Sequence, residues 1–256
     1  VKMIGPGYKS LGVPTLATDK LEVATKISQR LANNKVSLNA SFTWSKDNLI
    51  PWKRFTTSYM LFLFSANISP RNLPFFSVVY SPSFQKNNAA DLIEKIDNKY
   101  HMVVFTTGHN YRKWDVSFNT SLNYLMTLSD GRDSLPNSSS HGLQLSQSFV
   151  FPFPLSLSAS GGLTFSKLQG ISSRILSGDF NISYVLEDFI TIMSGIGTAY
   201  EKDLNKKNSA YLGLSGGYNQ YLNIEIRTEK NMYHQWFDNT ADYDEFLMKG
   251  IVTLKF

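Results

Sequence analysis

Hydrophobic and polar residues alternate one by one along most of this chain. From Val36 to Trp44 every second residue is apolar, and the residues between them are serine, asparagine and threonine. The same alternation runs, with few exceptions, from Trp114 to Met126, from Leu155 to Ser166 and from Leu176 to Leu186. Successive side chains of a β-strand point to opposite faces of the sheet. Each segment is therefore predicted to be a strand with one apolar and one polar face.

Two architectures fit strands of this kind: a soluble antiparallel sandwich and a transmembrane β-barrel. Strands of soluble proteins usually have about 5–6 residues, whereas a tilted strand that crosses a bilayer needs roughly 9–11. The segments here have the longer length, and their polar faces carry small Ser, Asn, Thr and Gly residues instead of Lys and Glu. Small polar groups suit a lumen. The sequence therefore predicts an all-β fold, an antiparallel transmembrane β-barrel with about 13–14 strands.

The expected strands and connections cover most of the chain. Strands are expected at 20–31, 36–44, 58–69, 75–85, 100–111, 114–128, 142–151, 155–166, 174–186, 189–200, 209–220, 222–233 and 245–256. Tight connections at 32–35, 70–74, 112–113, 152–154, 187–188 and 221 alternate with longer ones at 45–57, 86–99, 129–141, 167–173, 201–208 and 234–244. Outer-membrane barrels have short periplasmic turns and longer extracellular loops. We therefore expect the longer connections to lie outside the cell.

The C-terminal residues Val252-Thr253-Leu254-Lys255-Phe256 alternate and end on an aromatic residue. This ending resembles the signal that the barrel-assembly machinery recognises in bacterial outer-membrane proteins, with Val252, Leu254 and Phe256 as its residues. The usual signal has glycine five residues before the terminal aromatic residue. Here Ile251 occupies that position, and the glycine is Gly250. The resemblance implies a bacterial outer-membrane β-barrel protein, surrounded by outer-membrane lipid and lipopolysaccharide.

The N-terminal residues suggest a longer parent protein. The Asn-, Ser- and Tyr-rich composition and the segment Gly5–Gly12 look like barrels of Bacteroidota-type bacteria. Counting strands back from a periplasmic Phe256 places residue 20 outside the cell, whereas single-chain barrels have even strand numbers and periplasmic termini. We therefore expect the C-terminal barrel portion of a longer chain. Residues 1–19 would be an extracellular lead-in or lumen segment, and residues 20–256 the barrel.

Composition argues against several kinds of chemistry. The chain has no cysteine, which excludes thiolate nucleophiles and cysteine-ligated metals, and its four histidines are scattered. A net charge of +5 is weak evidence for nucleic acid. Ser140 and His141 are neighbours, but a nucleophilic serine also needs a group that orients the imidazole and an oxyanion donor. The sequence therefore predicts no metal, no cofactor, no nucleic-acid partner and no enzymatic activity.

Charges on the polar faces are the better clue to function. Glu225, Arg227 and Glu229 alternate with apolar Ile224 and Ile226. The other members of this candidate lumen charge ladder are Glu22, Lys26, Arg30 and Lys249. If the first and last strands meet, all seven would lie near one seam. Such a ladder sets ion preference or holds a plug; the alternative is a set of internal salt bridges that only satisfy the lumen.

Three functions follow from a barrel of this kind. The leading hypothesis is a channel or transporter that moves a solute or polypeptide through a polar lumen. The second is a structural barrel that anchors protein partners in an outer-membrane secretion or assembly complex. The third, a barrel enzyme, would need His109 or His141 to face a serine and a carboxylate. In each case we expect lipid contact through Val36, Leu38, Phe42, Phe62, Phe64, Phe118, Leu122, Leu157, Phe180 and Ile182.

Overall fold

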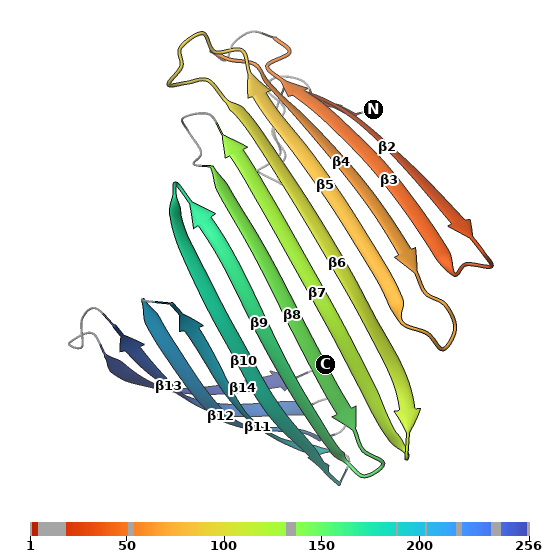
Figure 1. Cartoon of the computed structure of the whole chain (residues 1–256), viewed down its shortest axis with the longest axis vertical. Coiled ribbons are helices and arrows are strands. Elements are labelled where there is room, and N and C mark those ends of the chain that lie inside the picture. Colours follow the sequence, from red (N-terminus) through yellow and green to blue (C-terminus); the bar gives the residue numbers. More distant parts are fainter. Residues whose placement is uncertain are drawn as a thin grey trace. The chain divides into compact units, whose positions relative to one another are not determined.

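The structure, a computed structural model, describes residues 2–4, 19–50, 54–131, 137–187, 189–202, 204–218, 222–236 and 242–254. In these residues the chain forms one sheet of fourteen strands, in which each strand lies beside its neighbours in sequence (Figure 1). The strands are β1 (Lys2–Ile4), β2 (Lys20–Leu31), β3 (Val36–Asp47), β4 (Thr57–Ile68), β5 (Phe75–Asn87), β6 (Asp97–Lys113), β7 (Val116–Gly131), β8 (Ser138–Val150), β9 (Leu155–Leu168), β10 (Ile171–Leu186), β11 (Ile190–Glu201), β12 (Asn205–Tyr218), β13 (Leu222–Gln235) and β14 (Tyr243–Leu254). No helix in the described ranges has the length and apolarity that spanning a membrane requires.

Every strand predicted from the alternation is present, and one short strand is new. The new strand, β1, pairs antiparallel with the start of β2, so that Lys2 lies opposite Glu22 and Ile4 opposite Lys20. The sequence analysis expected no strand in the lead-in segment. Residues 5–18, which make up most of that segment, lie outside the described residues.

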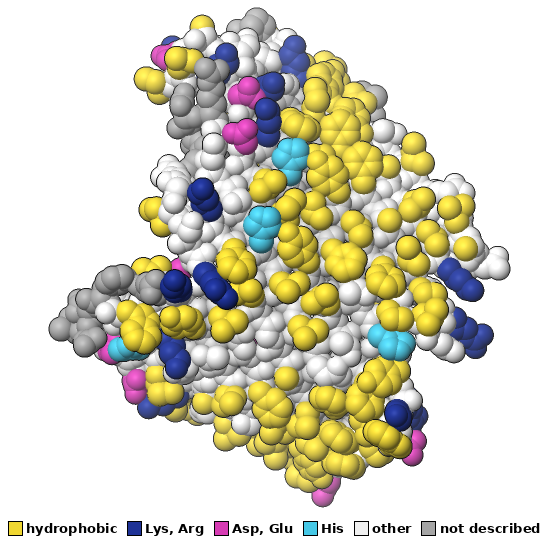
Figure 2. Space-filling model, in the orientation of Figure 1, with side chains coloured by type: hydrophobic (Ala, Val, Ile, Leu, Met, Phe, Trp, Pro, Cys, Tyr) yellow, Lys and Arg dark blue, Asp and Glu magenta, His cyan; other side chains and the backbone are white. Residues whose placement is uncertain are grey.

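The chain divides into two compact units. Unit 1 comprises Val1–Thr106, Tyr124–His141 and Ser166–Ser172, and unit 2 comprises Thr107–Asn123, Gly142–Phe165 and Ser173–Phe256. In unit 1, Ala40 on β3 lies opposite Ile27 on one side and Phe64 on the other. Directly paired residues of antiparallel strands share a face. Strands β2 to β5 thus gather their apolar side chains on one face, over which hydrophobic side chains cluster in Figure 2.

Unit 2 repeats this separation of faces across β10 to β14. One row of paired residues is Tyr184, Ile192, Leu214, Ile226 and Gly250, and a row of the opposite face is Asn181, Gly195, Tyr211, Glu229 and Leu247. A shift of one residue in any pairing would exchange the two faces. The alternation in sequence therefore excludes every pairing that is shifted by an odd number of residues across these five strands.

The sheet has almost no buried core, which separates the two architectures that the sequence left open. Among the described apolar residues only Ala89 and Pro82 are buried, and none of the ten residues predicted to face lipid is buried. Phe64 and Leu38 are 46% and 42% exposed. A sandwich would bury one face of each sheet against a second sheet. The described chain forms a single sheet, so the sandwich is excluded and the all-β antiparallel prediction is confirmed.

Pro82 lies inside β5, where it has no backbone N–H to donate. The carbonyl oxygen of Phe62, on neighbouring β4, instead accepts a hydrogen bond from Ser81 Oγ at 3.2 Å. The serine hydroxyl thus replaces a missing main-chain donor, and the strand continues through the proline.

Two connections correct the sequence analysis. Trp114 was predicted to begin a strand, but Trp114 and Asp115 form the turn between β6 and β7, with φ angles of 51° and 61°. Positive φ at both central residues is the type I′ geometry that matches the twist of a hairpin. The usual signal for this turn is Asn-Gly or Asp-Gly, which Trp-Asp does not provide. The Trp114 side chain is 79% exposed.

The expected long connections at 167–173 and 201–208 are also shorter than predicted. Strand β9 turns into β10 at Gln169 and Gly170, both with positive φ, and the chain between β11 and β12 covers only 202–204. Polar residues such as Arg174 and Lys206 belong to the strands themselves. The strands extend past their apolar portions here, and polar strand ends were mistaken for loop. The connections at 48–56 and 88–96 do remain long.

Candidate functional site on the polar face of β9 to β13

Asp179 and Asn181 form the first part of a polar network in unit 2. Asp179 Oδ1 accepts a hydrogen bond from Ser160 Oγ on β9 at 2.8 Å, and Asp179 Oδ2 lies 3.4 Å from Asn181 Nδ2. Asn181 Oδ1 in turn accepts from the Tyr211 hydroxyl at 2.8 Å. Tyr211 lies on β12, two strands away from Asn181 on β10. The network therefore crosses β11 without using a side chain from it.

Gly195 allows this crossing, because it lies between Asn181 and Tyr211 in the register. A Cβ atom at position 195 would lie 2.5 Å from Tyr211 Cε1 and in hard contact with Asn181 Oδ1. Both neighbours would have to move. The glycine thus makes room for the tyrosine ring to lie across the strand and reach its hydrogen-bond partner.

Arg227 and Glu229 form the second part of the network. The guanidinium carbon of Arg227 lies 4.1 Å from the centre of the Tyr211 ring, and Arg227 Nη2 lies 3.1 Å from Glu229 Oε2. These side chains are 44% and 25% exposed, so solvent screens the ion pair, which contributes at most about 1 kcal/mol. Stacking on Tyr211 and the fork geometry of arginine hold the cation in a defined position.

The three predicted charges of β13 share one face, as their spacing requires. Lys249 on β14 lies directly opposite Arg227, and Glu225 lies opposite Ile251. Neither Lys249 nor Glu225 has an ion-pair partner in the described part of the chain. The face therefore presents two adjacent cations between carboxylates. That these residues line a lumen stays a prediction.

The charges of β2 belong to unit 1. Glu22 pairs with Lys20 at 2.7 Å, on the same strand and face. Lys26 lies opposite Ser41 and Arg30 opposite Ser37. No ion pair of Lys26 or Arg30 is found among the residues described. The predicted seam between these residues and those of β13 and β14 stays a prediction.

Sequence reasoning missed Ser160, Asp179 and Asn181 as one network, and it missed Tyr211 and Gly195 altogether. Each is unremarkable in a chain rich in serine, asparagine and tyrosine. Their connection depends on which residues face one another on β10, β11 and β12. The only signal in the sequence is that glycines recur at 195 and 197, within one strand, where a close approach by a neighbouring side chain is a common reason.

The residues of the predicted assembly signal are only partly described. Val252 lies on β14 opposite Ile224 and is 64% exposed. The backbone of Leu254 ends β14, opposite Leu222. Phe256 lies outside the described residues. Recognition by the assembly machinery stays a prediction.

The histidines do not form a serine–histidine–carboxylate group in the described ranges. His101 Nδ1 is hydrogen-bonded with the Tyr80 hydroxyl, and His141 Nδ1 with the Tyr124 hydroxyl, both at 2.9 Å. His234 Nδ1 lies 2.6 Å from Asp242 Oδ2. No three His, Asp or Glu side chains of the described chain come together as metal ligands would.

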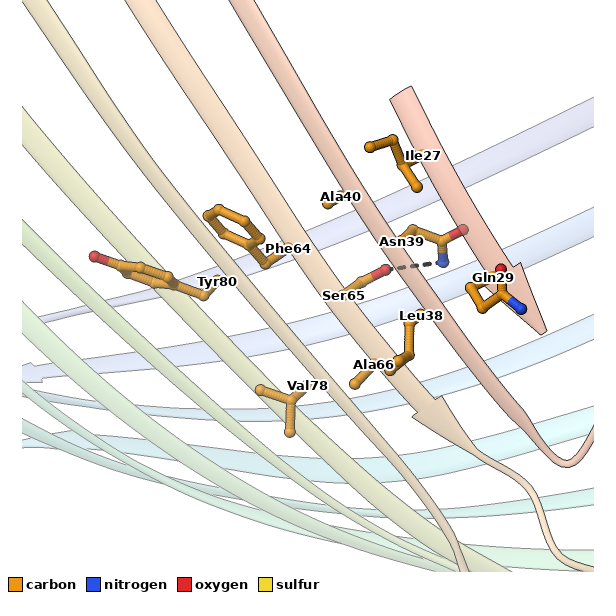
Figure 3. Close-up of a pocket in the computed structure, with 10 residues that line it drawn as sticks. All are labelled: Ile27, Gln29, Leu38, Asn39, Ala40, Phe64, Ser65, Ala66, Val78 and Tyr80. Carbon is orange, nitrogen blue, oxygen red and sulfur yellow. Dashed lines mark hydrogen bonds between the residues drawn. The ribbon is translucent and has the colours of Figure 1, made fainter. Parts of the chain in front are cut away.

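A groove of about 360 Å³ lies on the apolar face of unit 1 (Figure 3). Its lining includes Ile27, Phe64 and Tyr80, and the small side chains Ala40 and Ala66 leave the space between them. Figure 3 also shows the hydrogen bond between Asn39 and Ser65, which belong to the opposite face by the register. The groove has no charged lining residue. It can accept an apolar chain but has no group that selects a ligand.

The fold is similar to that of bacterial outer-membrane receptors. No protein-family model matches the sequence, and no curated protein matches it. The siderophore receptor PirA from Pseudomonas aeruginosa matches with a TM-score of 0.60 at 12% identity, over 83% of this chain and 39% of the receptor. The alcaligin outer-membrane receptor FauA from Bordetella pertussis matches with a TM-score of 0.53 at 14% identity, over 84% of this chain and 43% of the receptor.

At these identities the comparison establishes the fold alone. The chain has the fold of bacterial outer-membrane β-barrels, which confirms the predicted fold class, and the outer membrane predicted as its location is where this fold occurs. The chain spans about two fifths of the length of each receptor (39% and 43%).

The prediction that the chain is not an enzyme is corrected. The outer-membrane barrels similar to it also include OmpT of Vibrio cholerae, with a TM-score of 0.43 at 6% identity, over 91% of this chain and 96% of OmpT. A fold does not by itself decide whether a protein catalyses a reaction. The exclusion of enzymatic activity is therefore withdrawn.

Proposed function

We propose that the chain forms the wall of an outer-membrane channel or transporter, whose polar face lines the passage for a solute or polypeptide. The observation that carries this proposal is the network from Ser160 to Glu229, which keeps ionised groups on one face of the sheet. The opposite face of the same strands carries aliphatic residues such as Ile196 and Leu212, which are 62% and 57% exposed. A Bacteroidota origin stays a prediction.

Energetics support this orientation of the two faces. A charged arginine or lysine on the lipid face of a barrel costs about 2–4 kcal/mol near the bilayer midplane. Arg227 and Lys249 are paired neighbours in the middle of β13 and β14, so turning this face to lipid would incur that cost at both positions. The apolar face, which has no second sheet to cover it in the described structure, gains from lipid contact instead, and the Lys230 on that face is paired with Asp244 at 2.9 Å.

A charged lumen would also give the passage an ion preference. Arg227 and Lys249 are adjacent cations on the polar face, and Lys249 has no carboxylate partner in the described part of the chain. A mobile anion would be attracted to this position. Charge reversal at Arg227 should therefore shift selectivity toward cations.

The contacts of Arg227 also fit a purely structural role for this cation, in which it stabilises the polar face and does not set ion preference. That the barrel anchors partners in an outer-membrane secretion or assembly complex stays a prediction. Arg227 is stacked on Tyr211 and paired with Glu229. Arg227 thereby connects Tyr211 on β12 with Glu229 on β13, as a structural salt bridge does. In that case its loss should lower stability and leave transport unaffected.

Ion-selectivity recordings separate the two roles of Arg227. The purified chain, Arg227→Glu and Lys249→Glu would be reconstituted in planar bilayers, and the reversal potential measured in a KCl gradient. Arg71→Glu is the matched control, because Arg71 is exposed in the turn between β4 and β5 and receives the same change in charge.

The channel proposal predicts that both polar-face variants shift the reversal potential toward cation preference and that Arg71→Glu does not. Absence of conductance in the wild-type chain would overturn it. Conductance with unchanged selectivity in both variants, together with a lower melting temperature for Arg227→Glu, would establish the structural role instead. Lys249→Glu keeps the test informative if Arg227→Glu fails to fold.

A further inference from the structure

A cleft of about 640 Å³ opens at one end of the apolar face of β10 to β13. It is lined by Leu176, Thr198, Tyr200, Lys206, Asn208, His234 and Trp236. The register places Leu176 opposite Tyr200, Tyr200 opposite Lys206, and Lys206 opposite His234. All four belong to the face that elsewhere carries mainly apolar residues, together with the ion pair of Lys230 and Asp244. A polar and aromatic site is thus built into the end of an aliphatic surface.

The position of the cleft along the strands corresponds to the membrane interface. At the far end of the same face, Leu186 pairs with Ile190, and Ile224 pairs with Val252. Leu186 and Leu176 are about 33 Å apart along β10 at roughly 3.3 Å per residue. With a strand tilt of roughly 40° this distance spans about 25 Å of membrane, the height of the apolar band of a barrel. The cleft therefore lies at the level of the lipid headgroups.

An apolar groove continues directly from the cleft toward the middle of the face. This groove, of about 510 Å³, shares Thr198 and Asn208 with the cleft. On the apolar face it is lined by Gly178, Phe180, Ile196, Ala210 and Met232, and its lining also includes the polar residues Ser160, Asp179 and Ser209. The small residues Gly178 and Ala210 leave space between the larger ones. A molecule with a polar head and an apolar chain fits both parts at once.

The charges of the cleft favour an anion. Lys230, on the same face, is paired with Asp244 at 2.9 Å, and His234 is hydrogen-bonded with Asp242. The backbone N–H of Gln235 and the His234 side chain lower the pKa of Asp242, which keeps this carboxyl ionised. Lys206 has no carboxylate partner in the described part of the chain. It is the uncompensated cation of the cleft.

The remaining lining residues add donors and flat apolar surfaces. Asn208 Oδ1 accepts a hydrogen bond from Thr198 Oγ1 at 2.9 Å, which leaves the Asn208 amide group as a donor. The Trp236 ring stands edge-on to Tyr200 at 6.4 Å and to His234 at 4.9 Å between ring centres. Rings that support one another in this way form a rigid surface, and tryptophan and tyrosine are typical of the membrane interface.

We propose that this cleft binds the phosphorylated sugar headgroup of an outer-membrane glycolipid, with one acyl chain in the adjoining groove. Lys206 and Asn208 bind the phosphate, and Trp236 and Tyr200 contact the sugar. This inference rests on the orientation given under the proposed function, in which the apolar face contacts lipid. The groove of unit 1 is the contrasting case, because it offers space for an acyl chain but no cation.

Lipid binding to the full chain in detergent micelles tests the proposal. Three probes would be titrated and followed by native mass spectrometry: diphosphorylated lipid A, the same lipid without its phosphates, and inorganic phosphate. The variants are Lys206→Gln and Ala210→Leu, which fills the groove without a change in charge. Lys207→Gln is the matched control, because Lys207 is the next residue on the opposite face, 5.3 Å from the Tyr233 ring centre.

We expect diphosphorylated lipid A to bind about tenfold more weakly to Lys206→Gln and to Ala210→Leu, and unchanged to Lys207→Gln. The lipid without phosphates should bind the wild type as weakly as diphosphorylated lipid A binds Lys206→Gln. Equal binding of lipid A to Lys206→Gln and Lys207→Gln would overturn the proposal. Displacement of lipid A by millimolar inorganic phosphate, with no effect of Ala210→Leu, would show a free-phosphate site instead.

The result is distinguishable from failure of the proposed function. Lys206-dependent lipid binding in a barrel without conductance would refute the channel and leave the lipid site standing. Arg227-dependent selectivity with no loss of lipid binding in Lys206→Gln would refute the lipid site alone.

Discussion

Strands β2 to β5 and strands β10 to β14 each have one apolar and one polar face, but different kinds of residue form these faces in the two groups. On the polar face of the first group, neutral side chains pair across strands: Asn39 Nδ2 donates to Ser65 Oγ at 3.1 Å, and Ser77 Oγ donates to Asn67 Oδ1 at 2.6 Å. On the polar face of the second group, a charged and aromatic network runs through Tyr211. Neutral pairs hold strands together without selecting ions, whereas we expect the network of unit 2 to do both.

The apolar faces of the two groups also differ, in their content of aromatic side chains. In β3 to β5 the ring of Phe62 lies 4.8 Å from Phe42, 6.3 Å from Phe64 and 6.5 Å from Phe84. In β10 to β13 the corresponding face is aliphatic and ends in the cleft around Lys206. We therefore expect unit 1, apart from Lys26 and Arg30 on its polar face, to contribute mainly cohesion between strands. The ligand and ion specificity proposed above concerns unit 2.

The largest effect should come from filling the space over β11. Gly195→Val places a side chain in hard contact with Asn181 and the Tyr211 ring, and overpacking of this kind costs about 1–3 kcal/mol. We expect a marked loss of folded barrel, measured by the shift in gel mobility on heating and by thermal unfolding. Gly250→Val is the control, because a Cβ atom at position 250 would have no neighbour within 4 Å among the described residues. Equal losses in the two variants would mean that the Tyr211 crossing is not required.

The aromatic cluster of unit 1 should have the next largest effect. Phe62→Ala removes three ring contacts between neighbouring positions, which we expect to lower the free energy of unfolding by about 1–2 kcal/mol. Lipid replaces part of the lost contact, so the effect is smaller than in a soluble core. Leu63→Ala, on the opposite face, should cost less in the same urea titration. A larger effect of Leu63→Ala would contradict the role given to the rings.

A smaller effect is expected for the neutral pairs. Asn39→Ala removes the hydrogen bond to Ser65 and should lower the free energy of unfolding by about 0.5–1.5 kcal/mol. Because no charge changes, the reversal potential should equal that of the wild type. A shift in ion selectivity in this variant would contradict the expectation that the neutral pairs of β2 to β5 do not select ions.

The strands were predictable from the sequence, whereas the contacts between them were not. Period-two alternation depends on one chain segment at a time, so β2, which spans Lys20–Leu31, was predicted to the residue. Turns were harder, because the left-handed backbone at Trp114 and Asp115 is imposed by the hairpin and not by residues that prefer it. The ends of β10 and β12 were missed because polar residues continue a strand beyond its apolar part.

The candidate site was predictable only where it depends on one strand. Glu225, Arg227 and Glu229 share a face because of their spacing alone. The contact of Tyr211 with Asn181 depends on the register of three strands and on Gly195 between them. The pairing of Lys230 with Asp244 likewise depends on how β14 aligns with β13.

The smallest effect should be the pH dependence of Asp242. Its pKa is lowered in the folded state by the backbone N–H of Gln235 and by His234. Its stabilising contribution is therefore present above its ordinary pKa of 3.8 and is lost as the pH falls through the lower folded value. The difference in melting temperature between wild type and Asp242→Asn should be small at pH 7 and should vanish below that range. A difference that persists in acid would contradict this assignment.

We expect one face of the sheet to contact lipid and the other to contact water. Substitutions at neighbouring residues of β13 test this most directly. The chain has no cysteine, so Ile226→Cys and Arg227→Cys each introduce a single thiol. In the protein reconstituted in lipid vesicles, we predict that a charged, water-soluble maleimide labels Arg227→Cys. Ile226→Cys should resist this reagent. A spin label attached to this cysteine should have an EPR spectrum whose lines are broadened by oxygen dissolved in the lipid. Labelling of both positions at the same rate, or of Ile226→Cys alone, would contradict the account.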